Sequence, residues 1–166
     1  MMNLIDIARL LHVLSAFWMV AGVVARDITY WRASRSEDVR AVHALLEASE
    51  VFERWGVIRG SVAVLLFGLL ATWLGNWPLF GIFQGAGSNW LLISFVLFVG
   101  VSALVGPLGL VRRRRIRTSA AYHALAEGRV TSELSAALRD PVVTGYRIFE
   151  LIGLAVIIYL MEVKPF

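Results

Sequence analysis

Four long apolar runs dominate this sequence and restrict it to a small set of folds. They span residues 4–25, 57–77, 90–111 and 143–163. Each run is close to the ~20 residues that an α-helix needs to cross about 30 Å of hydrocarbon. Backbone polar groups in lipid must be satisfied within a segment, and the alternation typical of a strand barrel is absent. The pattern therefore predicts an all-α, polytopic membrane protein built as a four-transmembrane-helix bundle.

The composition supports a membrane protein and excludes several kinds of site. The 166 residues are 58% hydrophobic and only 17% charged, whereas an ordinary soluble domain is about 25% charged. This length suits one membrane domain, residues 1–166. Because the sequence contains no cysteine, disulfides, thiol catalysis and zinc-thiolate sites are excluded. Three scattered histidines do not make an all-histidine metal site, so we predict no metal site.

The distribution of arginine predicts how the chain is oriented. The connectors 26–56 and 112–142 are long and rich in arginine, whereas residues 78–89 carry no charge. By the positive-inside rule the long connectors are cytoplasmic and both termini lie outside, as expected for a multi-pass protein of a bacterial inner membrane. The net charge of +4 is then topogenic and attracts anionic membrane lipids. We therefore expect lipid partners and no nucleic acid.

The first connector has the pattern of an amphipathic helix. Ser34 and Glu37 have the spacing of a capping box, which marks a helix start. Apolar residues then recur at helical spacing through Phe52. We expect a helix that lies on the membrane surface and runs into the second span.

The second connector contains stop and start signals. We expect the third span to extend through Ala126 and to end at Gly128, because glycine favours helix C-termini. Thr131 can cap a short helix that ends before Pro141. Within the third span, Pro107 removes a helix hydrogen bond and predicts a kink.

A histidine inside the first span is the sharpest candidate for chemistry. His12 lies eight residues into the run, about 12 Å deep at 1.5 Å per residue. It shares one helix face, at spacings of three and four, with Asp6, Arg9, Ser15 and Met19. Three interpretations stay open: a haem ligand, a proton or quinone site, or a hydrogen bond to a backbone carbonyl or serine of a neighbouring helix. For a six-coordinate haem, the second ligand could be Met19, Met161 or His12 of another subunit.

A second intramembrane set lies near the cytoplasmic ends of the spans. Arg147 and Glu150 are one helical turn apart and can pair, and Arg59 could bridge to Glu150. Such groups can form a proton or substrate site. The alternative is that arginine extends to the head groups and neutralises Glu150.

Four consecutive arginines follow the third apolar run. We interpret Arg112, Arg113, Arg114 and Arg115 as a topological anchor that contacts lipid phosphates.

The opening helix also resembles known families. Residues 11–22 read LHVLSAFWMVAG and are followed by Arg26 and Tyr30, while WLLIS opens the third span at Trp90. This is similar to a bacterial family of predicted integral membrane proteins of unknown function, which is distantly similar to the copper-resistance D proteins and the HemJ-type protoporphyrinogen oxidases. The resemblance to HemJ implies that His12 is haem-associated. HemJ-type enzymes have a lysine four residues after a tryptophan in the third span. Here that position is Ser94, which argues against the oxidase activity.

Three functions from different classes follow from these features. The first is a haem- or quinone-associated redox protein that uses His12. The second is a non-catalytic membrane subunit or scaffold, which would dock on a membrane-complex partner through small-residue helix faces and residues 37–54. The third is a small dimeric transporter that uses Arg59 and Glu150. A homodimer is compatible with the first and third.

Overall fold

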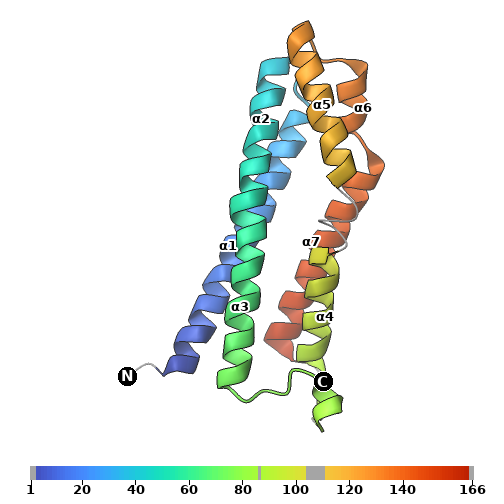
Figure 1. The fold of residues 1–166 in the computed structure, drawn as a ribbon. Helices are drawn as coiled ribbons and strands as arrows, with labels where there is room; N and C mark the ends of the chain where they lie inside the picture. The colour runs from blue at the N-terminus through green and yellow to red at the C-terminus, as the bar shows by residue number, and fades with distance from the viewer. Residues whose placement is uncertain (1–2, 86, 104–110, 165–166) are drawn as a thin grey trace. The chain divides into compact units, whose positions relative to one another are not determined.

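The part of the chain that the structure describes is mostly helical. The computed structural model describes residues 3–85, 87–103 and 111–164, and no strand occurs among them. Figure 1 labels the helices α1 to α7. The described residues also contain a π-helix (η1) and a 3-10 helix (η2). In chain order the elements are α1 (Leu4–Ala33), α2 (Val39–Phe52), η1 (Glu53–Ile58), α3 (Arg59–Leu74), η2 (Gly81–Gln84), α4 (Trp90–Ala103), α5 (Val111–Glu127), α6 (Ser132–Leu138) and α7 (Pro141–Val163). The all-helical class is thus confirmed.

Within the described residues, three helical runs are long and apolar enough to cross a membrane. They are Leu4–Ala33, Val39–Leu74 and Ser132–Val163, and a shorter apolar helix covers Trp90–Ser102. The expected membrane helices are therefore confirmed, while the count of four spans stays a prediction. The kink expected at Pro107 falls on residues 104–110, which lie outside the described residues.

The chain divides into two compact units. One comprises Met1–Gly75 with Arg114–Asp140, and the other comprises Asn76–Arg113 with Pro141–Phe166. Each is described by itself below, and the single membrane domain expected from the length stays a prediction.

The first unit is built on a helical hairpin. The α1 helix runs antiparallel to the continuous stretch α2–η1–α3 (Figure 1). The contact between the two arms is unusually close, because a Cβ on Gly22 would lie 2.5 Å from the Cα of Gly56. A Cβ on Gly60 would lie 2.8 Å from the Cα of Met19. Glycine at these positions lets the backbones approach, as is common in membrane helix pairs.

The hairpin corrects two expectations about the first connector. The first helix continues beyond residue 25 to Ala33, and Ser34 is its C-cap. The expected capping box at Ser34 was wrong: α2 starts one residue after Asp38, whose side chain accepts a hydrogen bond from the Arg40 N–H at 2.9 Å. The expectation that this helix runs into the second span is confirmed, since Val39–Leu74 is one continuous helical run. The α2 helix packs against α1 and buries Val42, and its placement on a membrane surface stays a prediction.

The second connector follows the sequence signals. The α5 helix ends at Glu127, and Gly128 takes a positive φ of 70°, which glycine adopts without strain. The Thr131 side chain caps α6 by accepting a hydrogen bond from Leu134 N–H at 3.2 Å. The Tyr30 hydroxyl donates to the Leu138 carbonyl at 3.0 Å and so ties α6 to α1.

The second unit contains η2, α4 and α7. Its two long helices are in contact, and a Cβ on Gly153 of α7 would lie 2.7 Å from a methyl of Val101 on α4. The rings of Trp77 and Trp90 meet edge to face at 6.3 Å, with the Lys164 ammonium 5.4 Å from the Trp90 ring. This places a cation beside two aromatic rings at one end of the unit.

Candidate functional site

His12 is hydrogen-bonded across the hairpin. Its Nδ1 lies 2.9 Å from the carbonyl oxygen of Val64 on α3. Because that oxygen can only accept, Nδ1 must carry the hydrogen. The ring lies over Gly68, where a Cβ would be 2.9 Å from both Cε1 and Nδ1. The missing side chain leaves the Val64 carbonyl open to a second donor, so the bond to a neighbouring backbone carbonyl, one of the three interpretations, is present.

This bond determines the chemistry of the other ring nitrogen. A neutral imidazole that is protonated on Nδ1 carries a lone pair on Nε2. No buried side-chain nitrogen or oxygen among the described residues lacks a hydrogen-bond partner, and the His12 side chain is half-buried. Nε2 therefore lies at the accessible surface of the helix pair, where it can meet a ligand.

The other residues of the predicted α1 face have separate roles. Asp6 closes the helix start, because its carboxylate accepts from Asn3 N–H at 3.3 Å. The Ser15 hydroxyl donates to Leu11 in its own helix at 2.7 Å. Met19 is buried against Gly60, whereas Arg9 is exposed. His12, Ser15 and Met19 thus follow the side of α1 that meets α3, and Asp6 serves the helix N-terminus.

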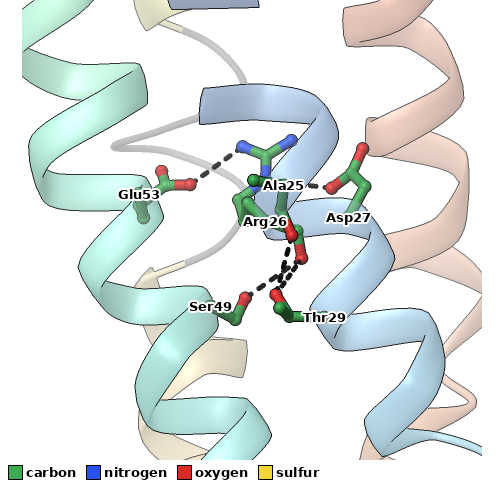
Figure 2. Close-up of polar contacts among 6 residues, drawn as sticks. All are labelled: Ala25, Arg26, Asp27, Thr29, Ser49 and Glu53. Carbon is green, nitrogen blue, oxygen red and sulfur yellow. Dashed lines mark hydrogen bonds and ion pairs between the residues drawn. The ribbon is translucent and has the colours of Figure 1, made fainter. Parts of the chain in front are cut away.

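A buried arginine forms a second polar centre at the other end of the hairpin. Arg26 is only 5% exposed. Figure 2 shows its guanidinium between two carboxylates: Nε lies 2.9 Å from Asp27, and Nη1 lies 2.8 Å from Glu53 on η1. Charge-assisted hydrogen bonds of this length are strong, and a buried guanidinium requires them.

The backbone of Arg26 is bonded as well. Its carbonyl accepts from the Thr29 hydroxyl at 2.9 Å and from the Ser49 hydroxyl of α2 at 3.4 Å (Figure 2). Sequence reasoning treated Arg26 as topogenic charge and missed Glu53 and Ser49. A signal was present, since Arg26 directly follows the first apolar run and Glu53 shortly precedes the second.

A further ion pair joins α2 to α5. Nε and Nη2 of Arg114 lie 3.1 and 3.0 Å from the two carboxylate oxygens of Glu50. This hydrogen bonding to Glu50 raises the pKa of Arg114 above its usual range. Arg114 is thus held by a carboxylate. Arg113 is half-buried, Arg115 is exposed, and the side chain of Arg112 lies outside what the structure describes, so their contact with lipid phosphate stays a prediction.

Arg59 is exposed and stacks on a neighbouring tryptophan. Its guanidinium carbon lies 3.2 Å from the centre of the Trp55 ring. Arg147 is half-buried and Glu150 is buried on α7, in the second unit. The expected bridge from Arg59 to Glu150 stays a prediction.

A comparison with models of protein families assigns the chain to one family. The family described as "Predicted integral membrane protein (DUF2269)" matches residues 6–165. The chain belongs to this family. The expected membership is confirmed, and the similarity to copper-resistance D and HemJ-type proteins is not shown. No curated protein and no solved structure matches the chain.

In this DUF2269 member, the serine four residues after Trp90 is buried. Its hydroxyl donates to the Trp90 carbonyl in its own helix at 2.7 Å, and Ser94 is 0% exposed. Among the described residues, no group of three or more His, Asp or Glu side chains could hold a metal ion.

Proposed function

We propose that this integral membrane protein binds haem through Nε2 of His12. The observation that carries the proposal is the 2.9 Å contact between His12 Nδ1 and the Val64 carbonyl. Histidines that ligate metals almost always donate their other ring N–H to a carboxylate, backbone carbonyl or water. The bond to Val64 therefore fixes the ring and the tautomer that an axial ligand to haem iron requires.

The same tautomer favours haem over an oxidised quinone as the ligand. A quinone carbonyl accepts hydrogen bonds, so a histidine that binds it must donate. In the neutral ring His12 already donates its hydrogen to Val64, and Nε2 offers a lone pair instead. A lone pair coordinates iron, and bound haem would supply one-electron transfer.

The second axial position would have to be filled from outside this helix face. His12 and Met19 are seven residues apart on α1, about 10.5 Å along the axis. Two side chains at that separation on one helix do not reach opposite sides of one iron. Met19 is therefore not a second ligand to the same iron, and His12 of another copy of the chain would be one source of that ligand.

The scaffold function has weaker support. Some of the small residues that could form its docking faces are in contact within the hairpin, as Gly22 is with Gly56, whereas a Cβ on Gly145 would meet nothing within 4 Å. The apolar face of α2 is likewise turned toward α1, where Val42 and Leu46 are buried.

The test is a visible absorption spectrum of detergent-purified protein, before and after dithionite, with haem supplied during expression. The informative variant is His12→Asn, because the amide nitrogen of asparagine can still donate to Val64 while the ligating nitrogen is lost. His123→Asn is the matched control, since His123 is exposed on α5. We expect a Soret band that shifts on reduction in the wild type and in His123→Asn, and no band in His12→Asn.

Two results would contradict the proposal. One is a well-folded wild type that is colourless although its expression host is replete with haem. The other is an unchanged Soret band in His12→Asn. Either result would leave His12 as a residue that joins two helices.

A further inference from the structure

We propose that Arg59 and Trp55 form a binding site for the phosphate of an anionic phospholipid on the outer surface of the hairpin. Arg59 is exposed, and its guanidinium carbon lies 3.2 Å from the centre of the Trp55 ring. Nothing in the membership of the family assigns a ligand to these residues. The argument rests on the surroundings of Arg59, on its hydrogen-bonding groups and on its position along the hairpin.

The surroundings of Arg59 are apolar and unburied. Trp55 is 56% exposed and Leu66, seven residues after Arg59, is 61% exposed. Ile58 and Val62 lie on the same exposed side of the stretch η1–α3. In a helix long and apolar enough to cross a membrane, such a stripe is the side that meets lipid. Arg59 is thus a cation set into a lipid-facing stripe.

Arg59 has no hydrogen-bond acceptor among the described residues, and its recorded contact is the stack on Trp55. The nearby carboxylates are engaged elsewhere: Glu53 with Arg26, and Glu50 with Arg114 and Arg54. A guanidinium has five N–H donors in one plane. Stacking uses the face of that plane and leaves its edge for a ligand. Such donors in an apolar surface are costly unless an anion or water satisfies them.

The position of Arg59 along the hairpin suits a lipid headgroup. The ion pair between Glu53 and Arg26 defines a charged level of the hairpin. Arg59 lies six residues after Glu53, about 9 Å further along the helix axis toward the apolar part. Helix side chains lean toward the N-terminus, so the Arg59 side chain reaches back over Trp55 toward the charged level. This is how an arginine near a membrane boundary reaches the headgroups.

The chemistry selects a phosphate. A guanidinium fork matches two phosphate oxygens, and arginine is the residue of choice for such bidentate recognition. Because the fork lies on a lipid-facing stripe with Trp55 and Leu66, the acyl chains of a phospholipid could lie along the same side chains. A free phosphate ion would gain none of that contact. We therefore commit to an anionic phospholipid.

The experiment counts lipids bound to the full-length protein by native mass spectrometry in mild detergent. Phosphatidylglycerol is compared with phosphatidylcholine of the same acyl chains in the wild type, Arg59→Gln and Arg129→Gln. Arg129→Gln removes the same charge from an exposed site on the turn after α5. We expect Arg59→Gln to weaken phosphatidylglycerol binding about five-fold, while Arg129→Gln binds like the wild type. Equal binding by Arg59→Gln and the wild type would overturn the proposal.

Two further measurements complete the experiment. One distinguishes the planar guanidinium from a point charge, and the other distinguishes a phospholipid from a free phosphate ion. Arg59→Lys keeps the charge but loses the planar fork, so its phosphatidylglycerol binding should fall below that of the wild type. Binding as tight as in the wild type would mean that the site is a point charge and not the proposed fork. Inorganic phosphate at millimolar concentration should not displace the bound lipid. Displacement would overturn the lipid assignment, and circular dichroism of each variant controls for folding.

Discussion

The Arg26 guanidinium of α1 lies 2.8 Å from the Glu53 carboxylate at the start of the π-helix η1. One helical turn further along the hairpin, Gly22 of α1 meets Gly56 of the same π-helix. A π-helix widens the backbone locally and often marks a functional segment. Here it lies where the two arms approach most closely and where Arg26 is paired across them, so this segment sets how α1 and α3 pack.

Removing Arg26 should weaken the contact between α1 and η1. In Arg26→Gln, the Glu53 carboxylate loses its charged hydrogen-bond donor. Water cannot easily replace that donor, because the Arg26 position is only 5% exposed. We expect a loss of about 1.5–3 kcal/mol of stability, the value typical of a hydrogen bond to a charged group. Thermal unfolding in detergent measures it, with Arg129→Gln as an exposed control. If the pair acts as a unit, adding Glu53→Gln will cost less than the sum of the two single changes. Equal melting of Arg26→Gln and the wild type would show that the contact carries no stability.

A methyl group at the closest contact should force the helices apart. A Cβ on Gly22 would lie 2.5 Å from the Cα of Gly56, and the three nearest atoms there all belong to the backbone. Gly22→Ala should therefore cost about 1–3 kcal/mol, the usual penalty for overpacking. Gly145→Ala is the matched control, since a Cβ there meets nothing within 4 Å and alanine favours the helix. Chemical unfolding of both variants provides the comparison, and a neutral Gly22→Ala would contradict the close packing.

The tautomer of His12 can be observed directly. Nitrogen-15 NMR of selectively labelled protein should show a protonated Nδ1, because it donates to the Val64 carbonyl. In Gly68→Ala, a Cβ would lie 2.9 Å from the ring and should displace it, changing the Nδ1 shift. A protonated Nε2 in the neutral wild-type ring would rule out the hydrogen bond. The His43 and His123 signals serve as internal references.

The cap of α6 predicts a local effect. The Thr131 hydroxyl accepts from Leu134 N–H at 3.2 Å, and the loss of such a cap costs about 1 kcal/mol. Thr131→Ala should therefore speed amide exchange within Ser132–Leu138, whereas Thr131→Ser should not. Unchanged exchange in Thr131→Ala would show that α6 is held by tertiary contacts, such as that between Tyr30 and Leu138.

The local signals in the sequence were sufficient for part of this structure. Apolar runs of membrane-spanning length predicted a helical membrane protein, and Gly128 and Thr131 marked the end of α5 and the cap of α6. Each of these signals acts within a few residues of its own position, through backbone conformation or an N-cap. The prediction of a cap at Ser34 failed because Asp38, four residues later, caps the helix instead. Local spacing alone does not choose between two capping side chains.

The sequence by itself therefore determined the helices and their membrane character, and it marked His12 as unusual. Only the tertiary structure decided what His12 and Arg26 contact. Their partners Val64 and Glu53 lie 52 and 27 residues away. Which residues meet at such separations depends on the register of two antiparallel helices. That register is set by the meeting of Gly22 with Gly56 and of Gly60 with Met19, a property of two packed surfaces that neither helix carries alone.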